Sequence, residues 1–587
     1  MAFKHARTLC SAFVLGLVLS ACGGEGGDLI TGNISGGQGG SGGQGGTSGS
    51  GTSGTSGTSG TSGTSGTSGT SGTSGTSGTS GTPGAGAIGD PMSTFNQLGM
   101  LLPEDIHPLV DNIDPMDGSS ADITPASSPN CPSGTTDEGT TVVMFDDGDY
   151  FEGGSANPEF PVCVLDSDIL ADTTLTNDHV YVLDGEVFVG TGDAEDAAPP
   201  SPGDEVVLSI ESGVQIYADQ GSASAIRVTR GAQIDAQGTM EQPIIMAAVP
   251  VAGFAREIDG DPTDLTGRGD WGGLVLNGYA QTNSTEDAGN IPNELTSEAT
   301  NRNVFFGGND DGDSSGTVSY VIIAESGVAF APDAEVQGLT LEGVGSGTTI
   351  NNIQVIGSND DGIEWFGGAV NQSNILINGA EDDGLDIDLG FRGTIKNFIV
   401  RQANGLGDHG TESDNDGDDF GAMPVSRPVL ANGLFLIWGD GESGGALLRE
   451  GYGANFENVV FADGATLMGA PSAAVAGTSC IDNDDEVDED LNAFGLAYFC
   501  SVGAAEPDGD TFEEDWFAGM AQDGTTVTFE GMEDNTISVD PASYQVTTAV
   551  SPSSAVSEAD DYMGPVSSAD AQAQTEWWRG WTVHFGQ

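Results

Sequence analysis

A pair of adjacent aspartates followed by glycine occurs twice in this chain at an interval of 22 residues, as Asp360–Gly362 and Asp382–Gly384. Each pair begins eight residues after an asparagine, Asn352 or Asn374, that heads a short apolar run. This equal spacing predicts that the carboxyl groups of the two pairs occupy equivalent positions on neighbouring turns of a repeating structure.

Carboxylates stacked in this way repel one another. Parallel strands lie about 4.8 Å apart, and two carboxylates at about 5 Å repel by about 0.8 kcal/mol in water and about 3 kcal/mol at an effective dielectric of 20. Either the side chains extend into solvent or a cation lies between them. Calcium suits the second case because it collects six to eight oxygen ligands from flexible loops. The sequence therefore predicts calcium ligands at Asp360, Asp361, Asp382 and Asp383.

A second candidate calcium site is the segment Glu412–Asp419, in which acids alternate and Gly417 takes the sixth place, as in the first half of an EF-hand loop. Met423 stands at the twelfth place, where an EF-hand has glutamate, so a complete EF-hand is not indicated. The predicted ligands are Glu412, Asp414, Asp416 and Asp418. Residues 146–149, 309–313 and 482–486 are similarly acidic, and all these segments have the alternative of being solvated turns.

The same region also resembles pectin-cleaving hydrolases of the polygalacturonase type, which carry Asn-x-Asp, Asp-Asp, Gly-His-Gly and Arg-x-Lys in that order on a β-helix. Asn359–Asp361, Asp382–Asp383 and Gly407–Gly410 follow this order. The resemblance implies a general acid at Asp382 or Asp383, a base at Asp360 or Asp361, and a role for His409. An extra aspartate interrupts Gly-His-Gly and no Arg-x-Lys follows, so hydrolysis is the alternative rather than the main prediction.

Four aromatic residues suggest a sugar-stacking strip on the outside of the repeat. They are Trp365, Phe366, Trp438 and Tyr452. The competing interpretation is that they cover the core beside glycine-rich turns.

The repeat itself is visible in the asparagines. Asn352, Asn374 and Asn397 lie 22 and 23 residues apart, and each heads a segment whose first and third following residues are apolar. A period in the low twenties with short strands, abundant glycine and few helical patterns predicts an all-β solenoid, a right-handed parallel β-helix. Asparagines at the same turn of successive coils are expected to stack their amides into a ladder.

Several blocks, among them GDWGGLVLNG, DDGIEWFGG and EDDGLDIDLG, resemble a group of largely uncharacterised Gram-negative outer-membrane lipoproteins with a predicted β-helix. The resemblance covers roughly residues 165–585. It implies the fold and an outer-membrane location, and it supplies no activity.

The N-terminal segment has the features of an export signal over residues 1–21, with a short apolar run after Lys4 and Arg7. Leu19–Cys22 resembles the lipobox of bacterial lipoproteins, which implies that Cys22 becomes the lipidated N-terminus. Residues 22–90 are nearly all Gly, Ser and Thr, which predicts a disordered, flexible tether. We expect a capping region at 91–164, the β-helix at 165–505 and a second capping region at 506–587, because a solenoid must cover both ends.

Four cysteines outside the signal form two local pairs. In an exported chain they predict the disulfides Cys131–Cys163 and Cys480–Cys500.

The net charge limits which classes of binding partner are plausible. The chain has 13 basic and 89 acidic residues, a net charge of −76. Such a charge argues against nucleic acid and anionic lipid head groups and favours cations, although an acidic surface can serve solubility alone. No nucleotide-binding loop is present. The sequence thus predicts a lipid-anchored, calcium-stabilised β-helix that binds a glycan or a surface protein, with a polysaccharide-active hydrolase as the alternative.

Overall fold

The computed structural model describes only part of the chain, and all described residues fall in the unit that contains residues 83–587. They are residues 126–127, 130–143, 159–192, 199–201, 203–218, 224–248, 268–284, 294–297, 304–331, 334–402, 407–417, 419–437, 444–453, 455–464, 482–483, 493–499, 526–530, 538–540, 542–547 and 558–582. The predicted signal, Cys22, the tether and the pair Cys480–Cys500 lie outside these residues. Within them, no helix has the length and apolar character that a membrane span requires.

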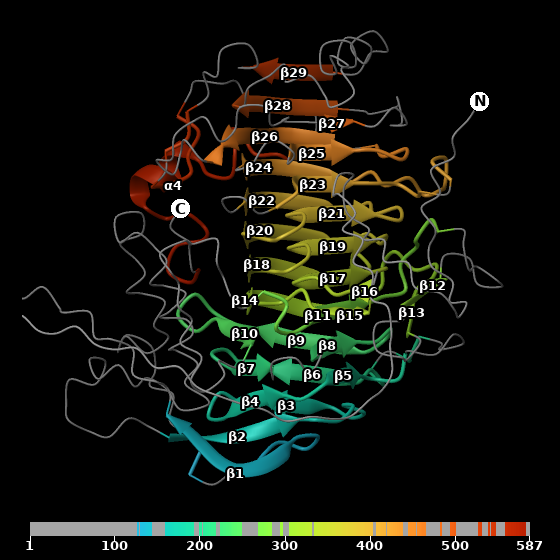
Figure 1. The fold of residues 1–587 in the computed structure, drawn as a ribbon, viewed down its shortest axis with the longest axis vertical. Coiled ribbons are helices and arrows are strands. Elements are labelled where there is room, and N and C mark those ends of the chain that lie inside the picture. Colours follow the sequence, from blue (N-terminus) through green and yellow to red (C-terminus); the bar gives the residue numbers. More distant parts are fainter. Residues whose placement is uncertain are drawn as a thin grey trace, which may run out of the picture. The chain divides into compact units, whose positions relative to one another are not determined.

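Two stacks of strands dominate the fold (Figure 1). Sheet B contains β5 (Glu186–Val189), β8 (Ala225–Val228), β11 (Gly273–Asn277), β17 (Leu339–Glu342), β19 (Ile363–Phe366), β21 (Leu385–Asp388), β23 (His409–Ser413), β25 (Gly444–Leu448) and β27 (Asp482–Asn483). Its strands pair in parallel in this order along the chain.

Sheet A contains the remaining parallel strands and one antiparallel strand, β1, at its start. Its members are β1 (Thr136–Val143), β2 (Glu159–Leu165), β3 (Thr173–Leu175), β4 (Val180–Leu183), β6 (Val207–Ile210), β7 (Gln215–Ala218), β9 (Gln233–Gln237), β10 (Ile244–Ala248), β14 (Gly316–Ala324), β18 (Thr349–Ile356), β20 (Asn371–Asn378), β22 (Thr394–Arg401), β24 (Val429–Ile437), β26 (Asn455–Asp463), β28 (Ala493–Phe499) and β29 (Thr526–Glu530).

Smaller elements lie beside the two sheets. They are the antiparallel pairs β12 (Glu294–Ser297) with β13 (Val304–Gly307) and β15 (Ala329–Ala331) with β16 (Ala334–Glu335), and the short helix α4 (Ser568–Ala573).

Successive coils are in register, and this confirms the predicted parallel β-helix. Ile363 of β19 pairs with Leu385 of β21, and Ile353 of β18 pairs with Ile375 of β20. Both pairs join residues one repeat apart, and alternate side chains of each strand point into one continuous apolar core. A residue at a given place in one coil therefore lies directly over its equivalent in the next.

The predicted asparagine ladder is also present. Asn352, Asn374 and Asn397 have φ angles of 54°, 60° and 54°, in the left-handed region, and each makes the bend that divides its long strand in sheet A. Asparagine tolerates this conformation better than most residues. The Nδ2 of Asn374 donates to the Oδ1 of Asn352 at 3.1 Å, and the Nδ2 of Asn397 donates to the Oδ1 of Asn374 at 3.3 Å.

Close packing explains why glycine follows the two aspartates in Asp-Asp-Gly. Gly362, Gly384 and Gly410 share one place in successive coils, directly before the register partners Ile363, Leu385 and Thr411 of sheet B. A Cβ added to Gly384 would overlap Val400 Cγ1 and lie 2.7 Å from the carbonyl oxygen of Gly410. The chain passes so close to the interior side chains of sheet A at this point that only glycine fits.

At the N-terminal end, the antiparallel pairing of β1 with β2 closes the ladder, because β2 also pairs in parallel with β4. The disulfide Cys131–Cys163 is present, with a Cα–Cα distance of 5.6 Å, as the sequence predicts. It ties the segment before β1 to β2.

The C-terminal end differs from the expected cap. β29 pairs in parallel with β28, so the ladder extends into the segment assigned to capping at 506–587. Aromatic residues near the C-terminus pack against side chains from successive strands of sheet A instead of covering the end of the coil. Trp578 and Tyr544 pack with Leu376, Ile399 and Val460 from successive strands.

We predict that Gly384→Ala lowers the free energy of unfolding by about 1–3 kcal/mol, the usual cost of overfilling a packed site. The matched control is Gly421→Ala, because Gly421 is exposed and a Cβ there meets only the Asp419 carboxylate at 3.5 Å. Urea unfolding of both variants measures the difference. Equal stability of the two variants would contradict the close approach at Gly384.

Candidate functional site

The predicted aspartates lie in the turns that lead into β19 and β21, one coil apart. The Oδ1 of Asp361 accepts a hydrogen bond from the backbone N–H of Asp383 at 2.9 Å. The Oδ1 of Asp383 in turn accepts from the backbone N–H of His409 at 2.5 Å. Both carboxyl groups are buried, so each uses one oxygen to hold the next coil in place.

Asp360 and Asp382 precede these buried groups and are more exposed. The Nε2 of Gln337 donates to the Oδ2 of Asp360 at 3.1 Å. Burial raises the pKa of Asp360 to about 7, and the Asp382 carboxylate one coil away contributes to this rise. The pKa of Asp382 is also raised, by burial and then by Asp408. The predicted repulsion between equivalent acids is therefore present in the fold.

A second acidic column, which the sequence analysis missed, runs along the outer side of sheet B. Glu364, Asp386 and Glu412 pair in register on β19, β21 and β23. Burial raises the pKa of Glu364 well above its usual range, and the neighbouring Asp386 raises it further. Burial likewise raises the pKa of Asp386 to about 7. The signal was available, because Glu364 and Asp386 repeat the 22-residue spacing four residues after Asp360 and Asp382.

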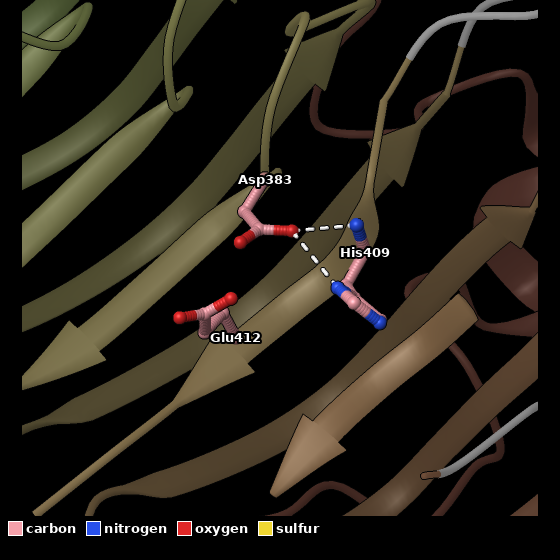
Figure 2. Close-up of side chains that lie close together, drawn as sticks. All are labelled: Asp383, His409 and Glu412. Atoms are coloured by element: carbon pink, nitrogen blue, oxygen red, sulfur yellow. Dashed lines mark hydrogen bonds and ion pairs between the residues drawn. The ribbon is translucent and has the colours of Figure 1, made fainter. Parts of the chain in front are cut away.

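The turn aspartates and the acids on the outer side of sheet B lie close together and form three groups. Within each group, the donor atoms all lie within 4.8 Å of one another. The groups are Asp360–Asp361–Asp382, Asp361–Glu364–Asp386 and Asp383–His409–Glu412. The first two contain only carboxylate oxygens and share Asp361. Figure 2 shows the third, in which the carboxyl groups of Asp383 and Glu412 lie on one side of the His409 ring.

Arg449 supplies the nearest strong positive charge, and the sequence analysis did not include it. It contacts Glu412 and binds Asp414 through two hydrogen bonds, Nε–Oδ1 at 2.7 Å and Nη2–Oδ2 at 2.9 Å. It comes from the end of β25, one coil beyond β23.

The segment Glu412–Asp419 therefore differs from the expected calcium loop. Asp414 is directed to Arg449, and the Oδ1 of Asp416 accepts from the backbone N–H of Asp419 at 2.9 Å. Asp418 lies outside the described residues. Because Arg449 takes Asp414 and a backbone N–H takes Asp416, these two acids do not converge with Glu412 as EF-hand ligands do.

The segment 309–313 is a structured turn as well. Asp311 Oδ1 accepts from the backbone N–H of Gln281 at 3.0 Å and pairs with Arg392 at 2.8 Å. Asp313 Oδ2 accepts from the backbone N–H of Tyr279 at 3.0 Å. These carboxylates serve the fold.

Comparison with protein families gives one match. Residues 167–479 match the family described as pectate-lyase-like β-helix domain. The chain belongs to this family. Searches of curated proteins and of solved structures found no match to the chain. A pectate-lyase-like β-helix fits a carbohydrate-binding or polysaccharide-active module.

The prediction of an exposed sugar-stacking strip is wrong for two residues of this pectate-lyase-like domain, Trp365 and Tyr452. Trp365 and Tyr452 have no exposed surface and belong to the interior core, where Trp365 stacks on Phe391 with ring centroids 5.3 Å apart. Trp365 points inward because of its place in the alternation of β19, and Tyr452 reaches the core from the turn between β25 and β26. Phe366 is partly exposed and lies near Phe306, and Trp438 lies outside the described residues.

The two all-carboxylate groups fit a hard divalent cation. Their donors are all oxygens, which calcium prefers. The Oδ1 of Asp386 is buried and has no hydrogen-bond partner in the described part of the chain, so a binding partner for this oxygen is missing. Asp360, Asp361, Glu364, Asp382 and Asp386 are the residues that would hold such a cation.

We predict that the stability of the chelator-treated protein falls as pH rises from about 5 to 8. Burial raises the pKa of Asp388, at the end of β21, to about 8, whereas an unfolded aspartate titrates near pH 4. The folded chain therefore binds more protons than the unfolded chain across this range, and stability is lost as these groups ionise.

Asp388→Asn should reduce the loss of stability between pH 5 and pH 8. The variant is expected to match the wild type in urea unfolding at pH 5 and to be more stable at pH 8, whereas the exposed control Glu241→Gln should follow the wild type at both pH values. A wild-type protein more stable at pH 8 than at pH 5 would contradict the raised pKa values.

Proposed function

We propose that this chain is a non-enzymatic carbohydrate-binding module, with calcium held by Asp360, Asp361, Glu364, Asp382 and Asp386 on the outer side of sheet B. One observation carries the proposal: two groups of carboxylate donors share Asp361 in the turns and strands of adjacent coils. The family assignment supports the carbohydrate part. The lipid anchor at Cys22 and attachment to the outer membrane are part of the same proposal.

Charge favours a cation as the link to the ligand. The acidic columns alone would repel a carboxylated glycan, whereas bound calcium has coordination positions for hydroxyl and carboxylate oxygens of a sugar. Arg449, the nearest arginine, already pairs with Glu412 and Asp414. Calcium is therefore the better source of positive charge on this surface.

Binding without cleavage also follows from the burial of the central acids. Asp361 and Asp383 are buried and each holds the backbone of the next coil through one oxygen, whereas a general acid or base must lie within hydrogen-bond reach of the substrate. Hydrolysis is retained as a second candidate because Asp382 is exposed and its pKa is raised, as a general acid requires.

We predict that calcium stabilises the wild type more than Asp386→Asn. At a calcium concentration about 100 times the Kd, binding adds about 2.7 kcal/mol, and the variant should lose most of this gain. In chelator at pH 8 the same variant should be at least as stable as the wild type, because it removes a buried charge. The measurement is urea unfolding of both proteins and of Glu241→Gln, with and without calcium. An equal calcium gain in all three proteins would argue against this site.

We predict calcium-dependent binding on a glycan array, with no release of reducing sugar from the bound glycans. Asp386→Asn should weaken binding at least about tenfold, and Glu241→Gln should bind as the wild type does. Reducing sugar that is released by the wild type and lost in Asp382→Asn would favour the hydrolase instead. Binding that is unchanged in chelator would contradict the role of calcium.

A further inference from the structure

The column of residues that begins with Asp361 and Asp383 changes its residue type at the third coil. Asp361, Asp383 and His409 take equivalent places in successive coils, two residues before the register partners Ile363, Leu385 and Thr411 of sheet B. The first two carboxylates each accept the backbone N–H of the residue in the next coil. At the third place the carboxylate is replaced by an imidazole.

This imidazole lies among acidic donors. The Nδ1 of His409 is 3.5 Å from the Oδ1 of Asp383 and 3.7 Å from the Oδ1 of Asp408. Glu412, three residues further along β23, completes a group whose donor atoms all lie within 4.8 Å of one another (Figure 2). His409 is 8 % exposed, so the group lies just below the surface.

We propose that Asp383, His409 and Glu412 form a transition-metal site that takes zinc. Imidazole nitrogen and carboxylate oxygen are both zinc ligands, and three protein ligands leave a fourth position for water, whereas calcium prefers oxygen donors alone. The site shares no residue with the calcium donors Asp360, Asp361, Glu364, Asp382 and Asp386, so the two metals bind at different places.

The surroundings hold the donors in position. The hydrogen bond from the His409 backbone N–H fixes the Asp383 carboxyl group beside the ring, and Arg449 contacts Glu412 from the next coil. Such outer contacts orient metal ligands. Tetrahedral zinc ligands lie about 3.4 Å apart at bond lengths near 2.1 Å. His409 Nδ1 and Asp383 Oδ1 already have this separation, at 3.5 Å, and Glu412 lies within 4.8 Å of both.

The test is a zinc titration of the untagged, chelator-stripped full chain by competition with a chromophoric chelator. The wild type is expected to bind one zinc ion more than His409→Gln, or to bind it at least about tenfold more tightly. Glu412→Gln should show the same loss. The matched control is Glu241→Gln, which removes an exposed acid outside both proposed metal sites and should leave zinc binding unchanged.

The outcomes separate this site from the calcium site. Zinc binding that survives both His409→Gln and Glu412→Gln, or zinc displaced by millimolar calcium, would overturn the proposal. If His409→Gln fails to fold by circular dichroism, Glu412→Gln decides. Cobalt substitution of the wild type gives a further measurement, because strong visible absorption is expected from a tetrahedral site with an imidazole ligand, and the weak spectrum of hydrated cobalt would contradict it.

Discussion

In-register stacking of the coils is the constraint on which the rest of this structure depends. Because equivalent residues of adjacent coils lie about 4.8 Å apart, each side chain meets a copy of its own type wherever the sequence repeats. For Asn352, Asn374 and Asn397 this contact is favourable, since an amide both donates and accepts. For the glycines before the sheet B strands it produces a column with no room for a side chain.

The same constraint is unfavourable for carboxylates, and this gives the acidic columns their properties. Asp361 and Asp383 reduce the cost by accepting backbone N–H groups. Glu364 and Asp386 accept no backbone N–H in the described part of the chain and interact with each other, and burial raises the pKa of both. A proton or a cation must therefore neutralise this face near neutral pH. A cation-binding surface follows from the repeat itself, and the family assignment gives it a carbohydrate context.

Sequence spacing predicted most features that repeat, and it missed Glu364 and Asp386, which repeat, as well as contacts that do not repeat. The asparagine interval gave the coil, its ladder and the stacking of Asp360 on Asp382, because these depend on neighbours one period away. Arg449 reaches Glu412 and Asp414 from a later coil after a long, irregular excursion, which no spacing reveals. The inward direction of Trp365 follows from strand parity, which a four-residue strand between glycine turns leaves ambiguous. Glu364 and Asp386 were within reach of the same 22-residue interval.

The most direct test of this account is the number of protons released when calcium is added to the unbuffered protein at pH 7. The stacked carboxyl groups of Asp360 and Asp386, with a pKa of about 7, are partly protonated at this pH, and calcium must displace these protons to bind. The account predicts the release of at least about one proton for each calcium ion bound. Calcium binding with no change in pH would show that these carboxyl groups are already ionised and that the repulsion between coils is absent.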